Sequence, residues 1–223
     1  MHLRVFGDPR IFQIGSVPVT STMISSVCVS LGLVVLAWFA RRQVLNRQSM
    51  LGQCAQLTVR WLDGMVAEII GRPEPSVVAL SGTLFLFIAA CNLSGQLPGV
   101  SPPTASLATT SALAVVVFIA VPFAGIRSRG PLGYLKHYFT PNPILFPLHL
   151  ISEFSRTLAL AMRLFGNIMS GHLVVGLIVA LAGFLVPMPF MALDLLIGLL
   201  QAYIFAVLST VFIGAAIGAE EQT

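Results

Sequence analysis

The chain has 223 residues, of which 57% are hydrophobic and only 9% are charged. A soluble domain usually carries about a quarter charged residues, so this composition excludes a typical water-soluble globule and favours an integral α-helical membrane protein. The net charge of +4 is assigned to basic loops that orient membrane spans, and no nucleic-acid partner is expected.

Five apolar segments follow one another along the chain, and each is long enough to cross a hydrocarbon core of about 30 Å. Clusters of Pro, Gly and Arg separate them, such as "GRPEP" before the second and "IRSRG" after the third. The sequence therefore predicts an all-α integral membrane protein, a single polytopic domain over residues 1–223, with spans at residues 22–40, 76–93, 105–125, 147–186 and 191–218.

The segment between the first two spans, residues 48–70, has a different pattern. Apolar side chains recur there at spacings of three and four, whereas Arg60, Asp63 and Glu68 take other angles. This pattern predicts an amphipathic helix on the cytoplasmic surface of the membrane. The alternative is that its apolar face packs against other parts of the same protein.

Basic residues predict the orientation of the chain. Arg and Lys are concentrated in residues 41–75 and 126–143, whereas residues 94–104 and 187–190 contain none. Basic loops stay on the cytoplasmic side, so the N-terminus is expected outside and the C-terminus inside. This arrangement requires an odd number of spans.

The fourth apolar segment is longer than a single crossing needs. About forty residues would form about 60 Å of helix, roughly twice the thickness of the hydrocarbon core. The segment is therefore either one steeply tilted helix or a hairpin broken near Gly166 or Gly171, which would give six spans. We favour one tilted helix because its polar residues form a continuous stripe.

This polar stripe is made of residues that share one helix face. Glu153 can pair with Arg156, whereas Arg163 has no acidic residue three or four positions away. A cation at the centre of a bilayer costs about 2.5–3.5 kcal/mol, and arginine does not lose its proton. Arg163 therefore needs a carboxylate from another element or a water-filled cavity. The members of the stripe are His149, Glu153, Arg156, Leu160, Arg163 and Asn167.

The fifth span supplies one buried acid, Asp194, with Gln201 seven residues later on the same face. Antiparallel packing of the last two spans predicts that His172 lies beside Asp194 and that Arg163 lies beside the neutral Gln201. Arg163 is then left without an acid of its own, which suggests that its carboxylate belongs to a partner subunit.

Structural alternatives remain for each of these residues. Arg163 could bond backbone carbonyls, and His172 with Asp194 could form a buried pair without a transport role. Asn92 and Gln96 are interpreted as polar groups at a helix end. His149 and Glu153 have the spacing of some metal ligands, but no third ligand accompanies them, so no metal site is expected.

Several motifs together resemble subunit a of F-type ATP synthases, the stator channel subunit of the membrane sector. "SRTLALAMRLFGNIMSGH" (155–172) is similar to the signature of that family. The family resemblance covers about residues 76–219 and also includes "NLSGQLPG" (92–99), "PTASLATTSALA" (103–114) and "LLQAYIFAVLSTVFIGAA" (199–216).

The resemblance implies a function. In this family two ion half-channels lie against a rotating ring of c subunits, and the essential arginine corresponds to Arg163. Asn167 and Gln201 match polar residues near it, and His172 and Asp194 match positions of the outer half-channel. Glu153 and His149 would line the inner half-channel.

The same resemblance implies the partners and the location. They are the c-ring, the b-subunit peripheral stalk and the rest of the complex in a bacterial inner membrane. No cofactor and no catalytic residue are expected, since no phosphate-binding GxxxxGK[ST] loop occurs. The sequence leaves the coupling ion open between H⁺ and Na⁺. The alternative functions are an independent ion-coupled secondary transporter and a non-conducting anchor.

Overall fold

The computed structural model describes residues 10–14, 17–44, 49–96, 102–139, 146–183 and 186–218. Five helices in it are long and apolar enough to cross a membrane. The prediction of an all-α membrane protein with five such helices and a separate amphipathic helix is therefore confirmed. The helices are α1 (Ser21–Val44), α2 (Met50–Ile70), α3 (Pro75–Ser94), the short 3-10 helix η1 (Pro103–Ala105), α4 (Leu107–Phe139), α5 (Phe146–Ala182) and α6 (Met188–Gly218).

A two-stranded hairpin precedes α1 and was not expected in an all-α chain. Strand β1 (Arg10–Ile14) pairs antiparallel with β2 (Val17–Thr20), with Ile14 opposite Val17. Both strands contain β-branched or aromatic residues, which suit extended backbone. They are only 5 and 4 residues long, too short to be recognised beside the much stronger apolar pattern of the spans.

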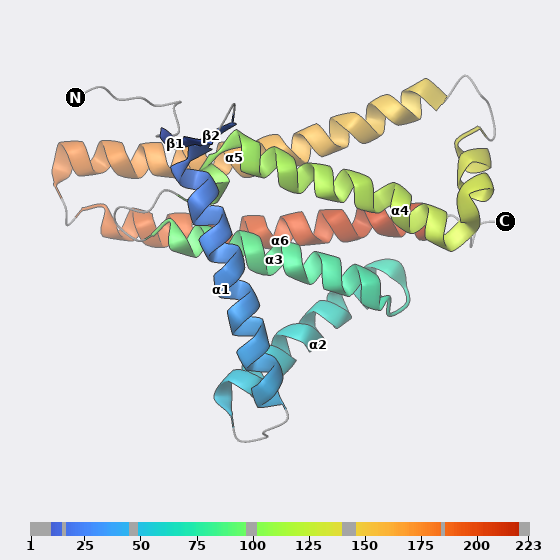
Figure 1. Cartoon of the computed structure of the whole chain (residues 1–223). Helices are drawn as coiled ribbons and strands as arrows, with labels where there is room; N and C mark the ends of the chain where they lie inside the picture. Colours follow the sequence, from blue (N-terminus) through green and yellow to red (C-terminus); the bar gives the residue numbers. More distant parts are fainter. Residues whose placement is uncertain are drawn as a thin grey trace.

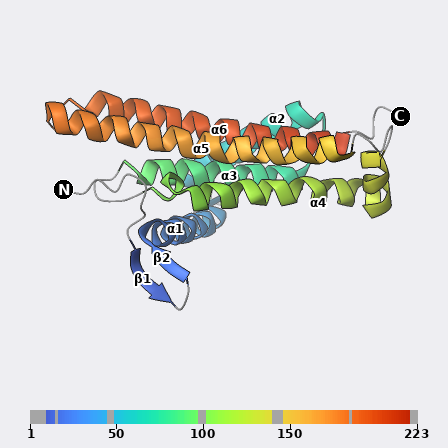
Figure 2. The ribbon, with the colours of Figure 1, turned by 90° about the horizontal axis from the view of Figure 1, so that it is seen from above.

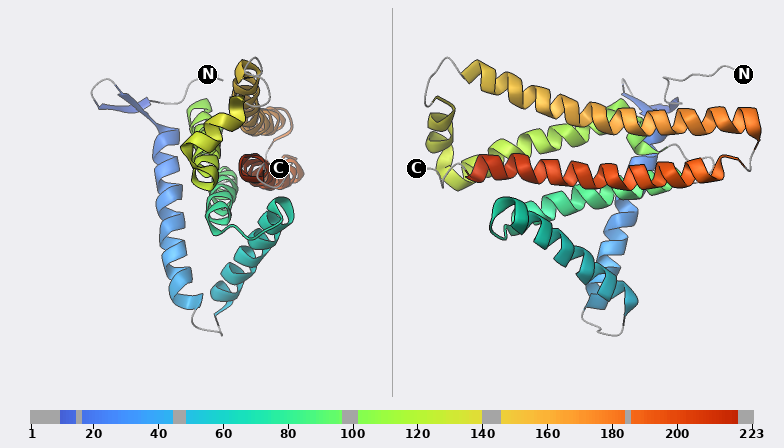
Figure 3. Two further views of the ribbon diagram at one scale, coloured as in Figure 1. Left: turned by 90° about the vertical axis from the view of Figure 1, so that its right-hand side faces the viewer. Right: turned by 180° about the vertical axis from the view of Figure 1, so that it is seen from behind.

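Helices α3, α4, α5 and α6 lie lengthwise beside one another in an elongated bundle, and α1 crosses this bundle at a steep angle (Figure 1). Helices α5 and α6 run side by side in opposite directions (Figure 2). Helix α6 is central, because it packs against α2, α3, α4 and α5. Viewed along the bundle, α1 and α2 form the two arms of a V (Figure 3).

Two apolar clusters hold the bundle together. The first joins α3, α4, α5 and α6 and contains Leu84, Ile88, Val117, Leu160, Leu164, Ile168, Ala202 and Phe205. The second joins α2, α3 and α6 and contains Leu62, Met65, Val66, Val77, Ala206, Ile213 and Ile217. The position of α6 in both clusters fixes the polar residues of its first half relative to α3 and α5.

Helix α2 has well-defined ends. The side chain of Ser49 caps its start by accepting a hydrogen bond from the backbone N–H of Gly52, at 3.4 Å. Gly71, with φ 82°, ends it in a left-handed conformation that costs glycine little because glycine has no Cβ.

The apolar face of α2 is divided between two environments. Leu62 is buried against α3 and α6, whereas Met50 and Leu57 are 84% and 71% exposed. The ring of Trp61 lies 5.5 Å from that of Phe85 and 5.6 Å from that of Tyr203. The later part of α2 therefore packs on the protein itself, and the earlier part leaves apolar side chains for lipid.

Helix α5 is continuous over 37 residues, about 55 Å at the usual helical rise. It does not break at Gly166 or Gly171, so the single long helix is confirmed over the six-span hairpin. Helix α4 continues past the predicted end at residue 125, and Gly130 (φ 75°, ψ 162°) interrupts its helical conformation.

Candidate functional site

Arg163 lies on the exposed surface of α5, while its neighbours Leu160 and Leu164 point into the bundle and are 2% and 0% exposed. Within the described residues, no carboxylate forms an ion pair with Arg163. The part of the chain that the structure describes therefore leaves this cation without an opposite charge.

The helix surface around Arg163 is formed by small residues. Ala159 lies four residues before it, Gly166 three after it and Ser170 seven after it, and all three are exposed. A Cβ added to Gly166 would meet nothing within 4 Å. Small residues allow the backbone of another membrane helix to approach closely, so this surface can bring a partner group near the guanidinium.

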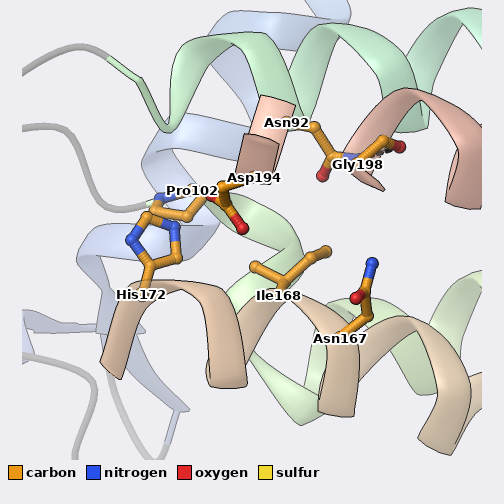
Figure 4. A pocket seen from close by; sticks show the side chains of 7 residues that line it. All are labelled: Asn92, Pro102, Asn167, Ile168, His172, Asp194 and Gly198. Atoms are coloured by element: carbon orange, nitrogen blue, oxygen red, sulfur yellow. Dashed lines mark hydrogen bonds between the residues drawn. The ribbon is translucent and has the colours of Figure 1, made fainter. Parts of the chain in front are cut away.

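A small pocket lies between the end of α3, the second half of α5 and the first half of α6 (Figure 4). It brings together three predicted site residues, Asn167, His172 and Asp194. His172 on α5 and Asp194 on α6 are its two ionisable side chains. Its full lining is Asn92, Pro102, Asn167, Ile168, His172, Asp194 and Gly198.

Asp194 has a different partner from the one that the sequence suggested. Its Oδ2 accepts a hydrogen bond from Nε2 of Gln96 at 3.3 Å. Its carboxyl group also lies against Gly171, where the absence of a side chain leaves room for it. No hydrogen bond joins Asp194 to His172 in the described chain, although both line the pocket. The expected mutual pairing is therefore corrected to a shared pocket.

Asn92 bonds across elements rather than serving only as a helix-end polar group. Its Nδ2 donates to the backbone carbonyl of Gly198 at 2.7 Å, and its Oδ1 accepts from the hydroxyl of Thr104 at 3.1 Å. A Cβ on Gly198 would lie 3.0 Å from Nδ2, so glycine permits this approach. The sequence signal was a pair of amides four residues apart, Asn92 and Gln96, at the end of an apolar span.

Gln201, the residue expected beside Arg163, is 5% exposed. Its Nε2 has no hydrogen-bond partner among the described residues, so no bond to another described side chain explains its burial. A buried amide donor without a partner costs about 1–3 kcal/mol.

Arg156 packs against an aromatic ring of α6. Its guanidinium carbon lies 4.8 Å from the centroid of the Phe212 ring, and its ion pair with Glu153 stays a prediction. A planar guanidinium is attracted to an aromatic face, which gives Arg156 a partner on α6. Glu153 is half-buried on α5. His149 is in the same helix, but its side chain lies outside the described residues.

Comparison with known proteins assigns the family. The family described as "ATP synthase A chain" matches residues 21–214. The chain belongs to the ATP synthase A chain family. This match confirms the resemblance inferred from the motifs, and every predicted site residue lies within it.

The chain is similar to individual members of the ATP synthase A chain family over nearly the whole length of both sequences. The chain is 43% identical over 212 residues to ATP synthase subunit a 2 of Bradyrhizobium sp. (strain BTAi1), covering 93% of each chain. It is 44% identical over 219 residues to ATP synthase subunit a 2 of Acaryochloris marina, covering 97% of this chain and 93% of that one. It is 42% identical to ATP synthase subunit a 1 of Chlorobium luteolum over the whole of both chains.

Proposed function

We propose that the chain is the ion-conducting stator subunit of an F-type ATP synthase membrane sector. In this role it conducts H⁺ or Na⁺ through two half-channels against a rotating ring of c subunits. The observation that supports this proposal most directly is Arg163, an exposed cation on an apolar helix that lacks an ion pair in the described chain.

Arg163 would act on carboxylates of the passing ring. A positive charge favours the ionised form of a nearby carboxyl group, so a ring carboxyl that reaches Arg163 would release its bound ion. The same fixed charge would repel cations and prevent a direct leak between the half-channels. The small exposed residues beside Arg163 support this role because they leave room for a ring helix.

The pocket that contains Asn167, His172 and Asp194 would form the outer half-channel. Glu153 and His149, which lie on α5 before Arg163, would line the inner half-channel. His172 follows Arg163 by nine residues, about 13.5 Å along the helix axis, so the pocket and the arginine are offset. This offset suits a path in which the ring carries the ion from one half-channel to the other.

The proposal also places the chain in an assembly. Its partners would be the c-ring, the b-subunit peripheral stalk and the remaining subunits, with the chain in a bacterial inner membrane. The N-terminus would lie outside and the C-terminus in the cytoplasm, since the basic loops favour that side. The chain would catalyse no reaction itself, because the chemistry of ATP would take place on other subunits.

Replacement of Arg163 tests the proposal. Arg163→Ala is expected to abolish ATP-driven ion pumping in membrane vesicles while the complex still assembles. Arg156→Ala is the matched control, because Arg156 is a second exposed arginine of α5 but stacks on Phe212. This control is expected to keep coupled pumping. Normal pumping by Arg163→Ala would refute the channel role.

Substitutions in the pocket test the outer half-channel separately. His172→Ala and Asp194→Ala are each expected to reduce pumping more than Cys91→Ala, which changes a buried residue of α3 outside the pocket lining. Equal effects would remove the pocket from the ion path. Accessibility of a cysteine added after Thr223, measured in oriented vesicles, would test the cytoplasmic location of the C-terminus.

A further inference from the structure

Two amide side chains at and just after the end of α3 form hydrogen bonds with successive turns of α6. Asn92 donates to the carbonyl of Gly198, and Gln96 donates to the carboxylate of Asp194. Each pair of residues is four apart in its own chain segment, which is about one helical turn. The two hydrogen bonds therefore lie one turn apart along the contact between α3 and α6, and we call this arrangement the amide clamp.

The Asn92 end of the clamp is fixed by its surroundings. Asn92 is 8% exposed, and Thr104, which donates to its Oδ1, is 0% exposed. The turn that follows α3 is also tightly packed, since a Cβ on Gly95 would stand 2.9 Å from Pro102. Gln96 is in this turn, so its position relative to Asp194 is fixed by the packing of the turn.

The chemistry of the Gln96 contact differs from that of an ion pair. An amide donates a hydrogen bond to a carboxylate without cancelling its charge. Among the described residues that line the pocket, His172 is the only other ionisable group, and neither Asn92 nor Pro102 ionises. Asp194 could bond either to the neutral Gln96 or to the ionisable His172. In the structure it bonds to Gln96.

We propose that Gln96 is a positioning residue of the outer half-channel, holding Asp194 away from His172 so that the carboxylate charge stays available to the translocated cation. This inference rests on the proposed function and extends it to a residue outside the predicted site. Without the amide donor, Asp194 would turn toward His172. The resulting pair would compete with the incoming cation for the carboxylate.

The test measures ATP synthesis by the complete complex in vesicles as the ion concentration on the N-terminal side is varied. Gln96→Met keeps the length of the side chain but removes the donor. It is expected to raise the half-saturating ion concentration roughly fivefold, the factor for the loss of one net hydrogen bond. The maximal rate is expected to stay unchanged, since Arg163 is not affected. Leu93→Met, at an exposed position in the last helical turn of α3, is the matched control and should cause no change.

Gln96→Lys separates positioning from simple bracing of the two helices. Lysine keeps a donor that can reach Asp194 but adds a fixed positive charge. If Gln96 only braced α3 against α6, this variant would behave like the unmodified protein. The proposal instead predicts a rise in the half-saturating concentration at least as large as that of Gln96→Met, because the charge of Asp194 is then neutralised.

Three results distinguish the possible failures. A lower maximal rate with unchanged half-saturation in Gln96→Met would overturn the positioning role and leave a structural one. Unmodified half-saturation in both variants would overturn it as well. If the unmodified complex itself showed no dependence of synthesis on the ion, the proposed function would fail, and this inference would fail with it.

Discussion

The carboxyl group of Asp194 lies directly against the backbone of Gly171, and a Cβ added to Gly171 would stand 2.8 Å from its carboxyl carbon. This contact joins the second half of α5 to the first half of α6. It means that the position of an acidic side chain on one helix depends on the absence of a side chain on the other.

Gly171→Ala is therefore expected to displace Asp194 or to separate α5 from α6. Overpacking of this kind costs about 1–3 kcal/mol, and we expect ATP-driven ion pumping to fall roughly tenfold. Gly176→Ala is the control, since a Cβ at Gly176 of the same helix would meet nothing within 4 Å. Equal pumping rates for the two alanine variants would contradict the importance of this contact.

The contacts of Asn92 predict a loss of stability. Asn92→Leu keeps the approximate volume but leaves the buried hydroxyl of Thr104 without its acceptor, at a cost of about 1–3 kcal/mol. The midpoint temperature of unfolding in detergent should fall accordingly. Ser94→Ala should change it little, because the Ser94 hydroxyl donates to the Cys91 carbonyl of its own helix and to no other described residue. A Ser94→Ala effect as large as that of Asn92→Leu would argue against the cross-helix role.

A further bond between α3 and α6 joins two buried hydroxyls, those of Ser81 and Thr210, 2.7 Å apart. Hydrogen bonds between membrane helices contribute about 0.6 kcal/mol on average. Ser81→Ala and Thr210→Val should each lower stability by roughly this amount or somewhat more. The double variant should cost less than the sum of the two. Strict additivity would show that the hydroxyls do not interact, and Thr83→Ala on the exposed side of α3 serves as the control.

The docking of α2 can be followed by the fluorescence of Trp61. The Leu62 side chain fills the space above Gly82, where an added Cβ would stand 2.9 Å from Cδ1 of Leu62. Leu62→Ala should lose about 2–5 kcal/mol of packing and free the later part of α2. In a Trp38→Phe background, the emission of Trp61 is expected to change, because its contacts with Phe85 and Tyr203 would loosen. Leu57→Ala, at a 71% exposed position, should leave the emission as it was.

Apolar length alone was enough to predict the helices that cross the membrane. Long runs without charge have few other stable arrangements in a bilayer, so their number and order follow from the sequence. The hairpin before α1 could not be predicted in the same way. Its strands are short and are held by backbone pairing, and backbone pairing gives only a weak signal in the pattern of side chains.

The candidate site was predicted less completely. Helical spacing correctly brought His172 and Asp194 to one pocket, because both lie on neighbouring antiparallel helices. The partner of Asp194, Gln96, lies in the turn after α3, and the packing of a third helix against the other two does not follow from their spacing. Leu160 shows a related limit. It belongs to the predicted polar stripe but is 2% exposed, because its side chain packs in the apolar cluster that joins α3, α4, α5 and α6.

The unbroken course of α5 has a mechanical consequence. A rod-like helix holds Arg163 and His172 about 13.5 Å apart, and no local hinge between them can close that interval. If an ion passes between the two positions, as the proposed function requires, a molecule outside this helix must carry it, while α5 itself stays stationary.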